Sequence, residues 1–304
     1  MSLFTGSGVA LVTPFHGDGS VHYEKLTELI EFQLKNNTDA LIITSITGEA
    51  STLAADEHIE TIRVAVHAAR AYEHDAREPK KRVPVIASTG GNYTEYSVNL
   101  CARAQAAGAD GLMLAAPYYN KATPKGLAEH FAKLASSADL PIIIYNAPGR
   151  TGLNIAPKTI KALTEISNIV GINEASGNIV QIAEIVELCG EELDIYAGND
   201  DYVVPVLSLG GKGVISDAAN IIPGQMHEMT VNYLNGAIAS AVKLQIGILE
   251  LSRALSCEIS PIPVKAALNI MGFNVGGYRL PLTSMEPENE ALLHKAMKNY
   301  RLIQ

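Results

Sequence analysis

Residues Ile166 to Asn178 read ISNIVGINEASGN and contain the unit from which the fold is predicted. The apolar run Ile169–Ile172 indicates a buried strand, and a polar turn leads to a helix expected to begin near Ile179. A continuous apolar run, rather than an alternating one, is typical of a strand covered on both faces in a parallel sheet. Asn173 and Glu174 follow directly, so two polar side chains are expected where this strand ends.

The same unit recurs along the chain, with apolar runs alternating with amphipathic segments such as Tyr23–Leu34 and Asp56–Ala71. Eight such units over about 225 residues predict the α/β class and a closed (β/α)₈ TIM barrel rather than an open doubly wound sheet. Gly6-Ser7-Gly8 precedes the first run instead of following it, which argues against a dinucleotide-binding fold. The expected strands are Gly8–Val12, Ala40–Thr44, Val83–Ala87, Gly111–Ala115, Pro141–Tyr145, Ile169–Ile172, Asp194–Ala197 and Gly213–Ser216.

No further strand is indicated after about residue 224. The chain is therefore expected to divide into a barrel at 1–224 and C-terminal helices at 225–304, packed on the barrel or against another subunit. The charged stretch Tyr72–Arg82 is expected to be a surface insertion between a helix and the third strand. The expected C-terminal helices are Met226–Asn235, Ala237–Ser256, Pro263–Met271 and Glu286–Arg301.

The composition excludes several classes of protein. A net charge of -9 over 304 residues argues against a nucleic-acid surface, which needs clustered Lys and Arg. No apolar run approaches the roughly 18 residues of a membrane span. Cys101, Cys189 and Cys257 lie far apart, which favours a reduced, cytoplasmic protein with buried thiols. The histidines lack metal-ligand spacing, so neither a metal nor another cofactor is expected.

Barrel enzymes carry their chemistry at the carboxyl ends of the strands. After the second strand, Thr47 lies in a hydroxyl-rich turn that suits either a bound carboxylate or a helix N-cap. The fifth strand ends at Tyr145, and a Pro-Gly turn then presents Arg150. A phenol beside a guanidinium suits an acid/base group next to an anion clamp, and the alternative is a solvated arginine.

The remaining strand ends have simpler explanations. Tyr118 and Tyr119, after the fourth strand, suit either packing or a proton relay. The acidic run Gly198–Asp201 is explained by a helix N-cap and is not predicted to bind a metal. Gly210–Gly213 lacks the spacing of a phosphate-binding loop.

Taken together, these strand ends resemble the dihydrodipicolinate synthase and N-acetylneuraminate lyase family over nearly the whole chain. The resemblance implies a (β/α)₈ barrel with C-terminal helices, a homotetramer built from tight dimers, and condensation of pyruvate with aspartate semialdehyde in lysine biosynthesis. Arg150 matches the synthases rather than the neuraminate lyases. The matching motifs are Thr47–Glu49, Pro117–Lys121, Tyr145–Gly152, Glu174–Gly177, Gly198–Asp201, Gly210–Ser216 and Pro261–Lys265.

The resemblance also implies a role for each matching residue. Thr47 would bind the pyruvate carboxylate, Arg150 would hold the carboxylate of the semialdehyde, and Tyr145 would be the acid/base phenol. Tyr119 would reach into a neighbouring subunit's site and relay protons. The substrate pocket would be lined by the backbone of Gly198 and Ile215.

The sequence departs from the family at the position that matters most. Asn173 replaces the lysine that forms an imine with pyruvate, and an amide nitrogen is not nucleophilic because its lone pair is delocalised into the carbonyl. Loss of a covalent nucleophile costs on the order of 10⁶ in rate. Lys121 and Lys212 are expected to be solvated rather than to substitute for the missing lysine.

Further departures surround this one. Ile46 stands where the family has a threonine that links the acid/base tyrosine, Tyr145, to the relay tyrosine, Tyr119. Ser45 replaces a glycine, and Asp217 follows Ser216 where an apolar residue is usual. Several changes around one pocket favour natural divergence over a single engineered substitution.

Three interpretations remain open. The first is a synthase-like protein with weak or lost activity whose pocket still suits a small 2-oxo acid such as pyruvate. The second is a non-catalytic 2-oxo acid-binding or regulatory subunit that assembles with an active homologue. The third is an enzyme with altered, non-imine chemistry that uses Tyr145 and Asp217 for enolisation or hydration.

Feedback inhibition by lysine is common among the proteins that this chain resembles, and we expect it to be weak or absent here. Ala50 and Ala55 stand where polar contacts are usual, although His58, Asn92 and Tyr118 remain. Isothermal calorimetry with L-lysine is therefore expected to show little binding, and tight binding would contradict the expectation.

Overall fold

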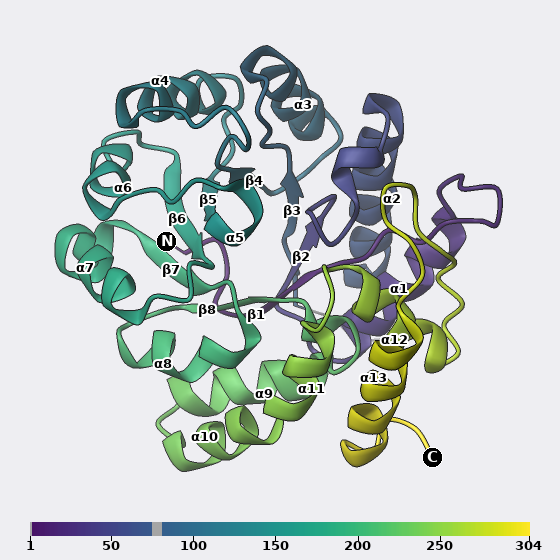
Figure 1. Ribbon diagram of the computed structural model, residues 1–304. Helices are drawn as coiled ribbons and strands as arrows, with labels where there is room; N and C mark the ends of the chain where they lie inside the picture. Colours follow the sequence, from purple (N-terminus) through teal and green to yellow (C-terminus); the bar gives the residue numbers. More distant parts are fainter. Residues whose placement is uncertain (1, 75–80) are drawn as a thin grey trace.

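Eight parallel strands close into a barrel in the computed structural model, which describes residues 2–74 and 81–304. Each strand pairs with the next along the chain, and β8 pairs with β1 to complete the ring (Figure 1). The predicted TIM barrel is confirmed. The strands are β1 Gly6–Ala10, β2 Ala40–Ile43, β3 Val85–Ser88, β4 Gly111–Ala115, β5 Ile142–Asn146, β6 Ile169–Glu174, β7 Asp194–Ala197 and β8 Gly213–Ser216.

Helices surround the barrel and cover the outer face of its sheet (Figure 1). Those that alternate with the strands are α1 Tyr23–Lys35, α2 Ala55–Glu73, α3 Thr94–Ala106, α4 Pro124–Ala135, α5 Pro148–Thr151, α6 Pro157–Leu163, α7 Ile179–Cys189 and α8 Val203–Ser208. After β8 come α9 Pro223–Leu234, α10 Ile238–Gly247, α11 Leu249–Leu255, α12 Ile262–Ile270 and α13 Pro287–Asn299. Single 3₁₀ turns occupy η1 Ala50–Thr52, η2 Gly190–Glu192, η3 Asp200–Tyr202 and η4 Ala218–Asn220.

Side chains alternate along each strand between the barrel interior and the helical layer, because successive residues of a strand point to opposite faces. Both faces are apolar, which explains the continuous apolar runs in the sequence. At the base of the interior, Phe4 stacks on Tyr196 with ring centroids 4.3 Å apart, and the Tyr196 hydroxyl donates to the Phe4 carbonyl. The interior cluster comprises Phe4, Ala10, Ala40, Ile42, Ile86, Met113, Ile143, Tyr196 and Ile215.

The predicted ends of some elements were wrong. The first strand was expected at Gly8–Val12 but spans Gly6–Ala10, because Gly6 pairs with Gly213 of β8 although neither is strongly apolar. A Cβ on Gly213 would lie 1.9 Å from the Gly6 carbonyl oxygen, so this close approach of two strands requires glycine. The sixth strand continues through the polar pair after Ile172 and ends at Glu174.

The long helix expected at Ala237–Ser256 is instead two helices, α10 and α11, that meet at Ile248. Gly247 immediately precedes the break, and glycine is among the poorest helix formers. No helix of the described residues is both long and apolar enough to cross a lipid bilayer.

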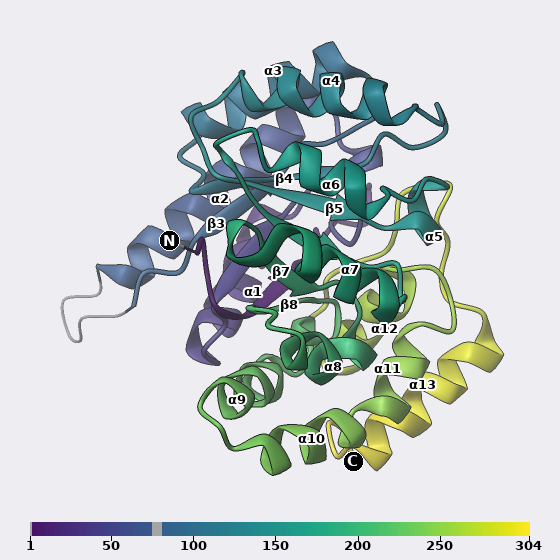
Figure 2. The same cartoon turned by 90° about the vertical axis from the view of Figure 1, so that its left-hand side faces the viewer.

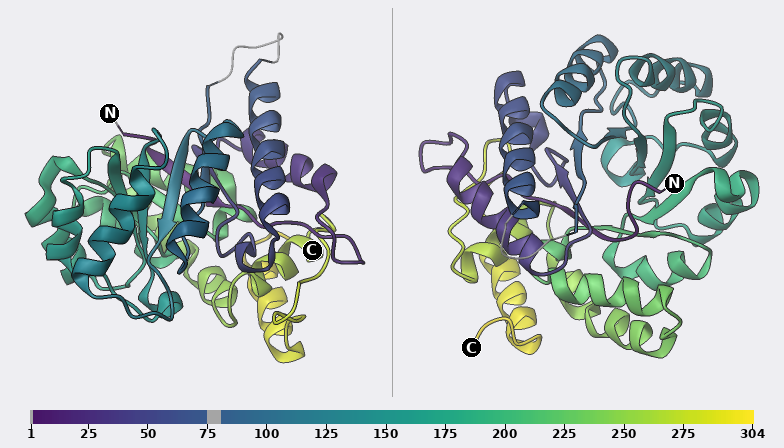
Figure 3. Two further views of the ribbon diagram at one scale, coloured as in Figure 1. Left: turned by 90° about the horizontal axis from the view of Figure 1, so that it is seen from above. Right: turned by 180° about the vertical axis from the view of Figure 1, so that it is seen from behind.

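The last five helices lie together beside the barrel and are coloured green to yellow in Figure 1. Helix α9 packs against β1 and α10, whereas α13 packs against α11 and α12. Figure 2 shows the N-terminus and α5 at opposite ends of the barrel, with α11 and α12 on the α5 side. Seen from behind in Figure 3, the N-terminal segment lies over the centre of the barrel. The division at residue 224 stays a prediction.

The surface insertion expected at Tyr72–Arg82 includes residues 75–80, which lie outside the described residues. On its two flanks, α2 continues to Glu73 and Arg82 pairs with Asp110.

A fully buried ion pair joins the C-terminal helices to the loop after β2. The Lys265 ammonium on α12 lies 2.8 Å from the Glu49 carboxylate, donates to the Thr13 carbonyl at 3.1 Å and sits over the Phe15 ring. Burial lowers the pKa of Lys265, and the Glu49 carboxylate opposes that effect. The other Glu49 oxygen accepts from the backbone N–H of Arg279.

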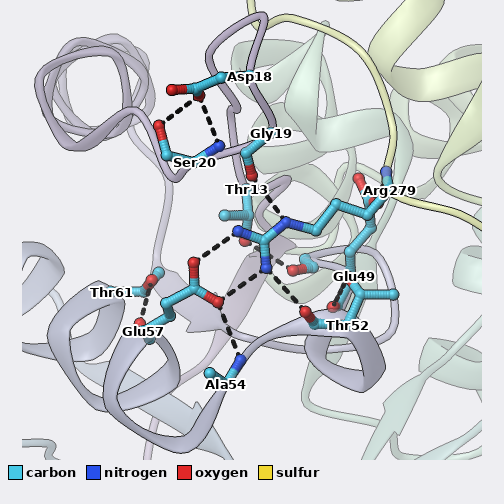
Figure 4. A network of polar contacts seen from close by, with 11 residues as sticks. Thr13, Asp18, Gly19, Ser20, Glu49, Thr52, Ala54, Glu57, Thr61 and Arg279 are labelled. Carbon is cyan, nitrogen blue, oxygen red and sulfur yellow. Dashed lines mark hydrogen bonds and ion pairs between the residues drawn. The ribbon is translucent and has the colours of Figure 1, made fainter.

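Arg279 extends the same connection to α2. Its guanidinium binds the two Glu57 oxygens at 2.6 and 2.8 Å, and it also donates to the carbonyls of Gly19 and Thr52 (Figure 4). These four hydrogen bonds tie the segments of Gly19, Thr52 and Glu57 together.

Removing one partner of the buried pair should be costly, because the other charge would be left in a site without water. Lys265→Met is expected to lower the free energy of unfolding by about 3 to 5 kcal/mol, measured by urea denaturation. The double variant Lys265→Met/Glu49→Gln should recover part of that loss. Lys125→Met, which removes an exposed partner of Glu129, is the control and should change stability far less. Equal effects of the two single substitutions would contradict the assignment.

Candidate active site

The carboxyl ends of the strands surround two adjoining cavities. An inner cavity of about 50 Å³ continues the barrel interior, and a wider cavity of about 480 Å³ shares Tyr145, Arg150, Gly198 and Asp217 with it. The inner cavity has room for only a few atoms, whereas the wider one suits a small metabolite. The inner cavity is lined by Ala10, Ser45, Ile46, Thr47, Met113, Tyr145, Arg150, Asn173, Gly198, Ile215 and Asp217.

Seven of the eight site residues predicted from the sequence therefore lie around one cavity. The eighth, Tyr119, follows β4, and its side chain is 89% exposed. It lines neither cavity within this chain.

Asn173 lines the inner cavity from β6. It is in register with Tyr145 on β5 and Tyr196 on β7, so all three side chains point to the same face of the sheet, into the barrel. Its side chain is 3% exposed, and its Nδ2 lies 3.9 Å from the Met113 sulfur. Its Oδ1 has no hydrogen-bond partner among the described residues. A buried acceptor without a donor is costly, so this oxygen is available to a ligand.

The space beside Asn173 is left open by Gly198. A Cβ on Gly198 would lie 2.8 Å from Asn173 Oδ1 and 2.5 Å from the Ala175 Cβ. The Gly198 N–H donates to the Glu174 carbonyl, which holds this backbone against the end of β6.

Tyr145 is held as a neutral phenol. Burial raises its pKa to about 12, the Asp217 carboxylate acts in the same direction, and the Arg150 guanidinium opposes them. The hydroxyl therefore stays protonated at neutral pH and can donate a hydrogen bond. Ile46, which lines the same cavity, offers no hydroxyl through which a proton could pass between Tyr145 and Tyr119.

Thr47 is engaged by Asp217, a contact that the sequence did not indicate. The Thr47 hydroxyl donates to Asp217 Oδ1 at 2.7 Å, joining the loop after β2 to the end of β8. The Thr47 hydroxyl, which was expected to donate to the carboxylate of a ligand, thus donates to a carboxylate of the protein itself.

A buried polar network holds the ends of β5 and β6. Asn146 donates to a Glu174 oxygen at 2.8 Å and to Asn154, and it accepts from the Ile155 N–H. The other Glu174 oxygen accepts from the Ser176 N–H and from Gln181. This network fixes the two strands that carry Tyr145 and Asn173.

Among the residues that the structure describes, Arg150 is the only one that brings a positively charged side chain to the two cavities. It lies on the four-residue helix α5 and donates to the Ser260 carbonyl at 3.3 Å. Four carboxylates line the wider cavity, on Asp200, Asp201, Asp217 and Glu258. The field at the mouth is therefore strongly negative.

The helix N-cap explanation for Asp200 was wrong. Asp200 is the first residue of the 3₁₀ turn η3, and its side chain makes no capping hydrogen bond there. Its carboxylate instead accepts from the Ser216 hydroxyl at 2.5 Å and from the Ala218 N–H at 2.9 Å. It therefore braces the end of β8. Burial raises its pKa to about 7, and Asp217 acts in the same direction.

No lysine lines either cavity among the described residues. Lys121 is exposed on the loop after β4, and Lys212 precedes β8, which places it at the opposite end of that strand from the cavities.

Possible metal ligands gather at one place in the described part of the chain, at His16, His22 and Glu24. The two imidazole rings stack with centroids 3.9 Å apart and an interplanar angle of 19°. Lone pairs lie in the ring planes, so nearly parallel stacked rings do not converge on one ion, and this group lies outside both cavities.

Sequence reasoning missed three contributions to the site. Glu258 reaches the wider cavity from the C-terminal region, Asp200 braces β8, and Glu49 binds Lys265. The acidic character of Gly198–Asp201 was a usable signal for the second, whereas nothing local to Glu258 indicated its position.

The chain is similar to known proteins over its full length. A model of the dihydrodipicolinate synthetase family matches residues 3–300. The 4-hydroxy-tetrahydrodipicolinate synthase of Lachnoclostridium phytofermentans is 51% identical over 304 residues, covering all of both chains. That of Caldicellulosiruptor bescii is 50% identical over 300 residues, covering 99% of this chain and 98% of the relative.

Solved structures agree with these sequence relatives. The dihydrodipicolinate synthase of Aquifex aeolicus superposes with a TM-score of 0.92 at 43% identity, covering 98% of this chain and 99% of that one. The fold, the motifs at the strand ends and these similarities lead to one conclusion: the chain belongs to the dihydrodipicolinate synthetase family.

Proposed function

We propose that this chain is a synthase-family protein that forms no imine with pyruvate, lacks synthase activity, and binds a small carboxylate ligand at the barrel mouth. The single observation that carries the proposal is the Asn173 amide at the end of β6, in a cavity that no described lysine lines. Its relatives are named synthases, and we place its origin, by descent, in lysine biosynthesis.

The chemistry of the lining residues supports this proposal. Imine formation needs a neutral amine, and the candidates in the cavity are a delocalised amide and a guanidinium that stays charged. Neither attacks a ketone. The loss of the nucleophile alone accounts for a rate lower by about 10⁶.

The bond between Thr47 and Asp217 is a second obstacle to the family reaction. Pyruvate held by the Thr47 hydroxyl would place its carboxylate next to the carboxylate that already accepts from it. Like charges at such separations repel strongly in a site with little water.

Arg150 and Tyr145 support continued binding. A guanidinium beside a protonated phenol at one cavity offers donors to a carboxylate, and both remain. In this proposal Arg150 anchors the ligand, Tyr145 donates to it, and Gly198 and Ile215 shape the pocket.

A regulatory subunit is the second candidate, favoured by the exposed aromatic side chains around the loop after β4. Tyr93, Tyr96, Tyr118 and Tyr119 are all exposed in this chain, Tyr119 almost fully. Such a group suits a contact between subunits. The homotetramer and the reach of Tyr119 into a neighbour's site remain part of this proposal. Enolisation by Tyr145 and Asp217 is the third and less favoured candidate.

The first test is chemical trapping. Incubation with pyruvate and sodium borohydride, followed by intact-mass spectrometry, is expected to leave the mass of the protein unchanged, because no amine is placed to form the imine. An active synthase treated in parallel should gain the reduced pyruvate adduct. A stoichiometric adduct on this chain would refute the proposal.

The second test restores the missing groups. Asn173→Lys/Ile46→Thr supplies the amine and the relay hydroxyl but leaves Thr47 engaged by Asp217. We expect Asn173→Lys/Ile46→Thr/Asp217→Leu to trap pyruvate at least about tenfold faster than that double variant, because the Thr47 hydroxyl is released to the ligand carboxylate.

The matched control for these variants is Asn173→Gln/Ile46→Thr/Asp217→Leu, which is similarly bulky at residue 173 but keeps an amide. It should form no adduct. Equal trapping rates in the double and triple variants would show that Asp217 does not obstruct pyruvate.

A further inference from the structure

We propose that the ligand of the inner cavity is a small amino acid, whose ammonium group faces Asn173 and Asp217 and whose carboxylate faces Arg150. This inference rests on the proposed binding function and names the chemical class of its ligand. It replaces the 2-oxo acid implied by resemblance with the corresponding 2-amino acid.

The first argument is the unpartnered polar atoms of the cavity. Asn173 Oδ1 and Ser45 Oγ are both buried, both residues line the inner cavity, and neither atom has a hydrogen-bond partner among the described residues. The Asn173 Nδ2 faces Met113, so the oxygen is the atom left without a partner. An amide oxygen only accepts, and it requires a donor from the ligand.

A ketone does not supply that donor. The carbonyl oxygen of a 2-oxo acid accepts hydrogen bonds, so the Ser45 or Tyr145 hydroxyl could donate to it, but Asn173 Oδ1 would still be left without a donor. An ammonium group on the same carbon carries three donors. It could serve Asn173 Oδ1 and the Asp217 carboxylate together, with a third donor left for Ser45.

The second argument is charge. Asp217 lines both cavities, and one of its oxygens accepts from Thr47 while the other has no protein hydrogen bond in the described residues. Asp201 and Glu258 add negative charge to the wider cavity, and Asp200, whose pKa is raised to about 7, adds part of a charge, against Arg150. Such a mouth repels an anion such as pyruvate and attracts a ligand that carries a positive charge.

The free donors of Arg150 favour an amino acid over a simple amine as the ligand. Arg150 lines both cavities, and among the described residues its guanidinium makes one hydrogen bond, to the Ser260 carbonyl, so most of its donors remain for a ligand. A ligand carboxylate at Arg150 would place opposite charges together at both ends of the ligand, with its ammonium group at Asp217 and its carboxylate at Arg150. The small inner volume suits the amino-bearing carbon, and a side chain would extend into the wider cavity.

Matched probes with one carbon skeleton test the proposal. Isothermal calorimetry at neutral pH would compare L-alanine, L-lactate and pyruvate, which differ only in the group on the second carbon. L-alanine is expected to bind at least about tenfold more tightly than pyruvate, with lactate between them because it donates without a charge. L-leucine and 4-methyl-2-oxopentanoate repeat the comparison with a side chain that reaches the wider cavity.

The variant Asp217→Asn tests whether Asp217 causes the preference for alanine over pyruvate, since the amide can still accept from Thr47 but carries no charge. It is expected to lower the ratio of alanine to pyruvate affinity by about tenfold. The charge-matched control is Asp139→Asn, which removes an exposed carboxylate that lines neither cavity and should keep that ratio. Thermal unfolding of both variants checks that they are folded.

The proposal is overturned if pyruvate binds as tightly as alanine, if neither of the amino acids binds, or if both substitutions lower the ratio equally. These outcomes are distinct from failure of the proposed function. A borohydride adduct with pyruvate rejects the loss of imine chemistry, whereas non-covalent preference for the 2-oxo acid without an adduct rejects only the amino-acid class.

Discussion

The buried ion pair between Lys265 and Glu49 is the interaction on which the geometry of the site depends. Glu49 lies two residues after Thr47, and its partner comes from α12, so the loop after β2 is held from the C-terminal region. Both charges are fully shielded from water, and each is satisfied by further hydrogen bonds. A buried pair of this kind specifies an arrangement more than it adds stability, because desolvation offsets much of its attraction. The helices after the barrel are therefore part of the site and not an appendage.

The barrel contributes a second constraint, which is the direction in which each strand side chain points. A strand residue points either to the interior or to the helices, and only the interior positions near the carboxyl ends reach the cavity. Tyr145 and Asn173 are register partners on neighbouring strands, so a substitution at one changes the surroundings of the other. Under the proposed function, an asparagine in place of a lysine at this position removes a nucleophile without disturbing the barrel. The position would then offer a ligand an oxygen that accepts instead of an amine that attacks.

Much of this could be predicted from the sequence, because apolar runs separated by amphipathic segments are local patterns. The barrel, its eight strands and the position of Asn173 at a strand end follow from such patterns. Contacts between distant residues could not be predicted in the same way. Thr47 and Asp217 are 170 residues apart, and Glu49 and Lys265 are 216 apart, so nothing near either member indicates its partner. The start of the first strand at Gly6 was missed because it depends on backbone pairing with Gly213, a residue distant in the sequence.

The open space beside Gly198 has a consequence for the history of this protein. Asparagine and lysine codons differ by a single base, and the absent Cβ leaves room for a longer side chain at position 173. If a lysine preceded Asn173, as the proposed function holds, neither the codon change nor the packing beside Gly198 prevents its return. The bond between Asp217 and Thr47 would be the larger obstacle, since a lysine at position 173 would meet a pocket in which the threonine hydroxyl is already engaged by a carboxylate.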